Sequence, residues 1–250
     1  MDFWIQAVLI CLVTLSGAFV QRVSGFGFGI LVMMFLPHIM GASFAQATAL
    51  SSLISFFSTL YVALSVVKKC DWKTLVFPLI GCFALTFPCL YFLKSSVNQK
   101  PLFIGLGVLL VVLSIYFLLF SSKIRFKPHW YSGLLFGAGS GTMNGLFSMG
   151  GPPAVIYFLQ TSADKDVYLA TIQMYFLMTN IYSNVCRIAM GGFYTKAVFI
   201  LAPFGIIGMI AGNIIGKKVF GLLDTKKLRY CVYGFMAVSG VINVISAVMK

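Results

Sequence analysis

The sequence predicts an all-α protein that crosses a membrane several times, and its composition is the first reason. Of the 250 residues, 60% are hydrophobic and 9% are charged, and the mean hydropathy is +0.99. A soluble domain carries about 25% charged residues, so this chain has too few of them for a surface in water. A bilayer, in contrast, accepts apolar side chains on the outside of a helical protein.

The second reason is a series of apolar runs, at roughly 3–37, 42–67, 74–93, 101–121, 130–160, 167–190, 197–216 and 228–249. A helix that spans a membrane needs about 20 residues, and most of these runs fit one span each. The runs 3–37 and 130–160 are too long for one crossing and too short for two. We therefore expect each of them to be a broken or re-entrant helix.

The centre of each long run is rich in glycine. The first reads Ser24-Gly-Phe-Gly-Phe-Gly29. The second holds Gly137-Ala-Gly-Ser-Gly141, then Gly145, then Gly150-Gly-Pro-Pro153. Glycine and proline at this density break helices. Irregular backbone at membrane depth survives only where it is buried or lines a cavity, so the two breaks are the expected place of a site.

The chain also looks duplicated, with residues 1–125 as a first membrane repeat and 126–250 as a second, within one integral membrane domain. A broken run opens each half, and Ala47-Thr48 in the first half matches Ala170-Thr171 in the second. If each long run returns to its starting side, most Lys and Arg residues fall on one side of the membrane, as the positive-inside rule requires. This arrangement makes the two halves inverted repeats, which are typical of secondary transporters.

The charged residues narrow the class of ligand. The net charge of +13 lies in short clusters between the apolar runs, whereas nucleic-acid binding would need a basic face with exposed aromatic rings. We expect the lipid bilayer as partner, and no nucleic acid. The sequence has no glutamate, and its five aspartates fall at segment ends or in loops. Because cation carriers often use a buried carboxylate, this favours a small anion as substrate.

Arg22 is the first candidate for binding that anion, since it lies immediately before the first break. A charge at membrane depth is costly and usually pairs or faces a water-filled path. The alternative is an arginine at a helix end that reaches out to the interface. Arg187 is expected near a membrane face.

The breaks supply further donors. A helix that restarts after a break presents free N–H groups and a positive dipole end, and glycine lets an oxyanion approach the backbone. Close packing through small residues and hydrogen bonds between helices is the alternative. The predicted substrate-binding residues are Arg22, Ser24, Gly25, Gly27, Gly29, Gln46, Asn144, Ser148, Gly150 and Gly151.

No enzyme, metal site or cofactor is expected. The six cysteines form no Cys-x-x-Cys pair. His38 and His129 lie far apart with no carboxylate near them in the sequence, so they form neither a metal site nor a catalytic pair. His38 is either a gate or proton carrier or an ordinary interfacial histidine.

At the glycine motifs the chain resembles the TauE/SafE sulfite exporter family, also called the 4-toluene sulfonate uptake permeases. That family has two homologous halves, each opening with a glycine-rich broken segment that runs toward a proline. Here Ser24–Gly29 runs to Pro37, and Gly137–Gly141 runs to Gly150–Pro153. The resemblance covers essentially the whole chain and implies transport of sulfur-containing anions, such as sulfite or organosulfonates, across the bacterial inner membrane.

Phe26 and Phe28 stand where the family more commonly has glycine, which leaves the substrate open. The expected function is a secondary transporter that works by alternating access around the two breaks. An anion channel and a non-transporting membrane assembly subunit are the alternatives. The sequence leaves open the direction of transport and the coupling ion. It also leaves open the oligomeric state, for which a homo-oligomer is one possibility.

Overall fold

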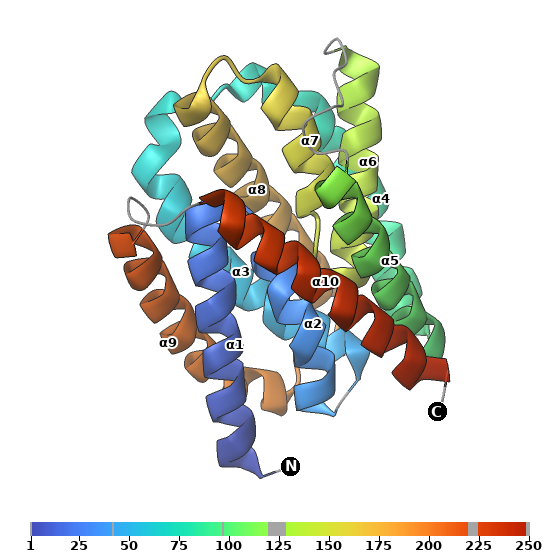
Figure 1. Ribbon diagram of the computed structural model, residues 1–250. Helices are drawn as coiled ribbons and strands as arrows, with labels where there is room; N and C mark the ends of the chain where they lie inside the picture. Colours follow the sequence, from blue (N-terminus) through green and yellow to red (C-terminus); the bar gives the residue numbers. More distant parts are fainter. Residues whose placement is uncertain (1, 42, 97, 120–128, 220–224, 249–250) are drawn as a thin grey trace.

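The computed structural model describes residues 2–41, 43–96, 98–119, 129–219 and 225–248. These residues are helical and contain no strand, which confirms the all-α prediction (Figure 1). The elements are α1 (Phe3–Ser24), α2 (Phe28–Met40), α3 (Phe44–Val66), the short 3₁₀ helix η1 (Val67–Lys69), α4 (Trp72–Ser95), α5 (Lys100–Leu119), α6 (Trp130–Phe147), α7 (Gly151–Thr161), α8 (Lys165–Met190), α9 (Lys196–Val219) and α10 (Thr225–Val248).

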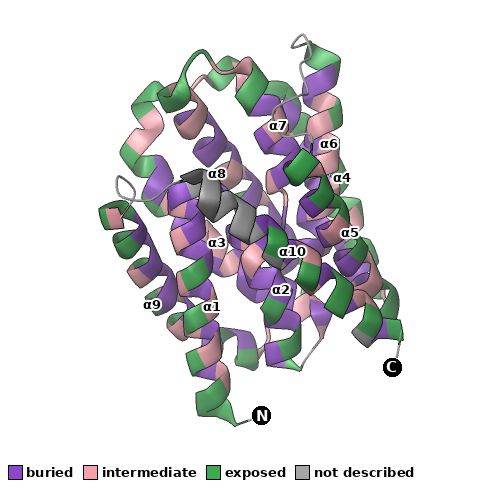
Figure 2. Ribbon diagram, viewed as in Figure 1, coloured by how far each residue is buried: buried purple, intermediate pink, exposed green. Residues whose placement is uncertain are grey.

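Several helices have the length and composition of membrane spans. Within the described residues, α1, α3, α4, α5 and α9 are long and apolar enough to cross a bilayer. The 22 residues of α1 give a length of about 33 Å at 1.5 Å per residue, close to the ~30 Å hydrocarbon core. Large apolar side chains such as Trp4, Leu135 and Phe199 are exposed, and Figure 2 shows exposed segments along the outside of the helices. This is the surface of a multi-pass membrane protein.

The two long apolar runs fold as helical hairpins. In the first hairpin, α1 ends at Ser24 and α2 begins at Phe28. Gln6 Nε2 in α1 donates to Ile39 O near the end of α2 at 3.4 Å, so the chain returns to the side from which it started. In the second hairpin, a Cβ on Gly133 near the start of α6 would lie 3.1 Å from the hydroxyl of Tyr157 in α7, so this chain segment also returns.

Helices from the two parts of the chain pack against each other in pairs: α1 with α9, α4 with α6, α3 with α8 and α5 with α10. Glycines bring the backbones close together. A Cβ on Gly208 of α9 would lie 2.1 Å from Cys11 O of α1, and one on Gly137 of α6 would lie 2.2 Å from Pro78 O of α4. Because lipid is as apolar as leucine, such close van der Waals packing is a main source of helix association in a membrane.

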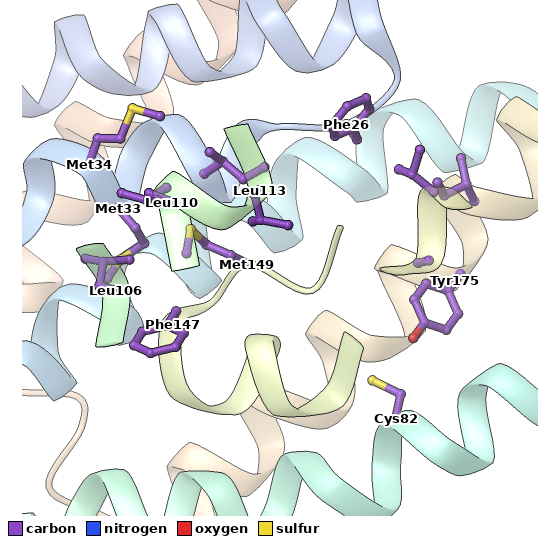
Figure 3. Close-up of a cluster of buried hydrophobic side chains, with 14 of the residues drawn as sticks. Phe26, Met33, Met34, Cys82, Leu106, Leu110, Leu113, Phe147, Met149 and Tyr175 are labelled. Atoms are coloured by element: carbon purple, nitrogen blue, oxygen red, sulfur yellow. The ribbon is translucent and has the colours of Figure 1, made fainter. Parts of the chain in front are cut away.

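The core surrounds both breaks. Phe26 comes from the first break, and Phe147 and Met149 flank Ser148 at the second. Figure 3 shows them among buried side chains of α2, α4, α5 and α8, namely Met33, Met34, Cys82, Leu106, Leu110, Leu113 and Tyr175. The Phe26 and Phe117 ring centroids lie 5.4 Å apart. The irregular backbone is therefore enclosed by protein, as a membrane environment requires.

Candidate functional site

The first break is a backbone turn that glycine makes possible. Gly25 closes α1 with φ +85°, and its N–H donates to Gln21 O at 2.8 Å. Gly27 precedes α2 with φ +103°. Both angles lie in the left-handed region, which residues with a Cβ adopt only at a cost. Gln173 of α8 donates from Nε2 to Gly25 O at 3.0 Å, so α8 holds this turn in place.

The second break has a serine in the left-handed region. Ser148 follows α6 with φ +54°, and its N–H donates to Asn144 O at 3.0 Å. Its hydroxyl donates to Thr48 O of α3 at 2.9 Å and accepts from Arg187 Nη2 of α8 at 3.0 Å. A non-glycine residue in this region costs about 1–2 kcal/mol. These two bonds tie the strained residue to α3 and α8.

The two breaks meet. A Cβ on Gly29, in the first turn of α2, would lie 2.3 Å from Ser148 O. At Gly29 there is therefore no room for a side chain between the first turn of α2 and the end of α6. The sequence separates these residues widely, and the tertiary fold places them in backbone contact.

A small cavity of about 40 Å³ lies where the breaks meet, and we call it the central cavity. The start of α2 and the start of α7 both line it, and neither has a side-chain cap. Helix starts carry a positive partial charge and N–H groups without a helical acceptor, although at α7 Pro152 and Pro153 have no N–H to offer. Its lining residues are Gln21, Gly27, Phe28, Gly29, Ile30, Ser55, Thr59, Asn144, Ser148, Met149, Gly150, Gly151, Phe176, Thr179 and Asn180.

This lining is suited to an anion. It contains hydroxyl and amide groups and no carboxylate. Asn144 is 5% exposed, and within the described part of the chain its Nδ2 has no hydrogen-bond partner. Leaving a buried donor unsatisfied costs about 1–3 kcal/mol. An anion in the central cavity would supply the missing acceptor.

Arg187 places a positive charge behind Ser148. Its side chain is 0% exposed, and Nη1 donates to Ser52 Oγ at 3.1 Å and to the hydroxyl of Ser183. Its Nε has no partner among the described residues. The ion pair that the described residues do form joins Lys69 to Asp166, so it does not involve Arg187. Charge without a carboxylate nearby is expensive inside a protein. The guanidinium therefore makes the electrostatic potential around Ser148 positive.

Arg187 was expected near a membrane face, and it does lie at a helix end, in the last turn of α8. The structure adds that its side chain is buried and points inward, toward serines of α3 and α8. The spacing of Asn180, Asn184 and Arg187 was the available signal, since residues four and seven apart share one helical face.

That face of α8 continues a polar seam against α3. Asn180 Nδ2 donates to Ser55 Oγ at 3.2 Å and to Thr59 Oγ1 at 3.3 Å, and Asn184 Nδ2 donates to Ser52 O at 3.4 Å. The predicted site did not include this seam. The hydroxyls of Ser52, Ser55 and Thr59 occur at helical spacing in an otherwise apolar segment, but only the packing of α3 on α8 brings the two polar faces together.

The structure divides the predicted site residues into groups. Six line the central cavity, namely Gly27, Gly29, Asn144, Ser148, Gly150 and Gly151. Arg22 and Gly25 line a different cavity of about 440 Å³. Gln46, in the first turn of α3, lines neither, and the side chain of Ser24 lies outside the described residues.

The larger cavity, which we call the basic cavity, is lined by Arg22 of α1, Lys165 of α8 and Lys217 of α9, against the carboxylate of Asp164. Gln21 lines both cavities. Arg22 therefore lines the basic cavity next to Gln21 and does not line the central cavity.

The family model described as sulfite exporter TauE/SafE matches residues 9–242. No curated protein and no solved structure matched.

Proposed function

Because the chain belongs to the sulfite exporter TauE/SafE family, which is a family of membrane transporters, we propose that it is a secondary transporter of a small sulfur-containing anion. The central cavity carries this proposal. It joins two helix starts, an unpaired amide donor and a nearby buried arginine, and its lining has no carboxylate. Neutral donors and helix ends bind an anion without fixing a permanent ion pair, so release stays possible during transport.

The size of the cavity favours a compact substrate. A water molecule needs about 10–15 Å³ when volume is measured with a water-sized sphere, so about 40 Å³ holds about three waters. Sulfite, with three oxygens on one sulfur, matches this space better than an organosulfonate with an apolar body. The substrate would lie between Asn144 and the first turn of α2, with Arg187 behind Ser148.

The helix arrangement supports alternating access. Two hairpins return to their own side, and α1 packs on α9 as α6 packs on α4. Both observations are expected for two inverted repeats of five helices, α1–α5 and α6–α10, within residues 1–125 and 126–250. The repeats would move against each other around the central cavity. By the positive-inside rule, the basic cavity would face the cytoplasm of a bacterial inner membrane.

Flux measurements test the proposal. The purified chain is reconstituted in liposomes, and sulfite uptake is compared between the wild type, Asn144→Asp and Asn144→Ala. Asn144→Asp keeps the shape and adds negative charge, so saturable uptake should be lost. Asn144→Ala removes one hydrogen bond to a charged group, worth about 1.5–3 kcal/mol, and should raise KM at least about tenfold.

Gln160→Glu is the matched control, because Gln160 of α7 is exposed and lines neither cavity. It should leave uptake near the wild-type value. Uptake that rises linearly with sulfite would indicate an anion channel instead. A folded wild-type chain with no flux and no sulfite binding would favour an assembly subunit and overturn the proposal.

A further inference from the structure

We propose that the basic cavity is a second binding site, and that its ligand is an organic anion with an apolar body. The central cavity and its substrate do not enter this inference, which depends on the lining of the basic cavity alone.

The cationic part of the basic cavity comes from three helices. Arg22 lies in the last turn of α1, Lys165 begins α8, and Lys217 lies in the last turn of α9. A Cβ on Gly216 would lie 2.9 Å from Arg22 Cβ, so the stem of Arg22 packs on α9 beside Lys217. Three cations on one cavity create a local positive potential that attracts anions.

The carboxylate in this lining is already engaged. Asp164 Oδ1 accepts the backbone N–H groups of Asp166 at 2.8 Å and Val167 at 2.9 Å, and so caps the start of α8. A capping carboxylate is stabilised where it is by the helix dipole. The three cations outnumber it, so the lining keeps an excess of positive charge.

The rest of the lining is largely apolar. Val23 and Val62 are buried, and Leu159, Leu169 and the ring of Tyr168 complete the wall. The volume of about 440 Å³ lies within the ~300–1,000 Å³ typical of small-molecule sites, which combine apolar walls with a few polar groups. A bare inorganic anion would leave this wall uncovered, and an uncharged apolar molecule would not interact with the charges of Arg22 and Lys217.

The site adjoins the central cavity, because Gln21 lines both.

Three probes separate the contributions of charge and apolar body. The purified full chain in nanodiscs of zwitterionic lipid is titrated by calorimetry with hexanesulfonate, methanesulfonate and hexanol, with empty nanodiscs as blank. Hexanesulfonate should bind at least about tenfold more tightly than either fragment, since each buried CH₂ contributes about 0.8 kcal/mol. Equal affinity for methanesulfonate or for hexanol would overturn the proposal.

Variants place the binding in the basic cavity. Lys217→Gln should weaken hexanesulfonate binding about 2–5-fold, the range for an exposed charge pair, and Lys165→Gln combined with it should weaken binding further. Lys196→Gln is the matched control, because Lys196 is exposed at the other end of the same helix, α9. An equal loss in Lys196→Gln and Lys217→Gln would contradict the assignment.

Filling the cavity is an independent check. Leu169 is half-buried in the wall, and Leu169→Trp should abolish binding of hexanesulfonate while the elution profile and thermal unfolding stay normal. If this variant fails to fold, the lysine variants decide. Unchanged binding in a folded Leu169→Trp variant would overturn the proposal.

The source of the ligand is settled by adding phosphatidylglycerol to the nanodiscs. Weaker apparent binding of hexanesulfonate would identify a bilayer lipid as the competing occupant, and unchanged binding would identify a soluble anion; both results retain the site. The titration needs no gradient and no sulfite. A chain that carries sulfite but fails to bind hexanesulfonate would therefore overturn this inference and leave the transport proposal intact.

Discussion

At the scale of single residues, Arg187 is a fully buried cation with no carboxylate partner among the described residues. Its partners are the hydroxyls of Ser52, Ser148 and Ser183, and its Cζ lies over the Phe193 ring, 5.8 Å from the centroid. Removing a cation from water costs several kcal/mol when no anion accompanies it. Three hydroxyl dipoles recover part of this cost, and a bound anion in the central cavity would recover more. The stability of the protein and its affinity for an anion are therefore coupled at this residue.

Thermal unfolding of the purified chain should report this coupling. Sulfite should raise the midpoint of unfolding of the wild type, because a ligand that binds the folded state stabilises it by mass action. In Arg187→Gln the charge is lost, and the sulfite-induced shift should fall by at least half. Arg187→Lys keeps a charge and should retain more of the shift. A full shift in Arg187→Gln would show that Arg187 has no part in binding.

At the scale of the elements, the start of α2 and the end of α6 meet without space for a side chain. A methyl group on Gly29 would lie 2.3 Å from Ser148 O, so it would push the two breaks apart. Gly29→Ala should destabilise the protein by about 1–3 kcal/mol, the usual cost of overpacking, and should reduce sulfite flux. Thermal unfolding in nanodiscs measures the first effect.

Gly234→Ala is the control for this change. Gly234 lies in α10 with open space around its Cα, and alanine favours a helix by about 1 kcal/mol relative to glycine. This variant should therefore be as stable as the wild type or slightly more stable. Equal stability of Gly29→Ala and Gly234→Ala would show that the breaks can separate freely.

The start of α4 gives a pH-dependent prediction. Asp71 caps this helix by accepting the N–H groups of Lys73 and Thr74, and donation from the Thr74 hydroxyl lowers the pKa of its carboxyl below the usual 3.8. A lowered pKa in the folded state means that the stabilisation is present above pH 3.8 and is lost as the pH falls through the lower folded value.

Asp71→Ala should cost about 0.5–2 kcal/mol at neutral pH, and this difference from the wild type should shrink below pH 3.8. Thermal unfolding across pH 3–7 measures it. Asp2→Ala is the control, because Asp2 precedes α1 without a side-chain capping bond and should have little effect. A difference that persists unchanged at low pH would contradict the capping role.

At the scale of the whole molecule, the contacts divide the helix ends between two faces. Lys69 pairs with Asp166 on the face that bears the connection from α7 to α8. At the opposite face, Lys94 donates to Met190 O and Lys100 Nζ donates to Val248 O. Both chain ends lie toward this second face (Figure 1). The two faces are the candidates for the inner and outer sides of the membrane.

Cysteine labelling in spheroplasts should assign these faces. A membrane-impermeant maleimide should label Lys196→Cys and should leave Lys217→Cys unlabelled until the cells are opened, because the basic face is expected inside. Both positions are exposed and lie on α9, so the comparison uses one helix. The reverse pattern would invert the topology and place the basic cavity outside.

The sequence by itself determined the class of this protein. Its apolar runs and its lack of charge predicted the helical, multi-pass membrane fold, and its glycine motifs pointed to the family that the chain belongs to. These properties are local, since hydropathy sets which segments enter a bilayer and the left-handed turns at Gly25 and Gly27 depend on the residues at those positions.

The tertiary structure alone decided which residues share a cavity. It brought Gly29 against Ser148, buried Arg187 behind the second break, and moved Arg22 into a separate basic cavity. It also placed hydroxyls of α3 opposite Asn180 of α8, which donates to them. These outcomes depend on contacts between helices far apart in the chain, which follow from shape and close packing over the whole molecule. A single segment shows at most which polar residues share one helical face.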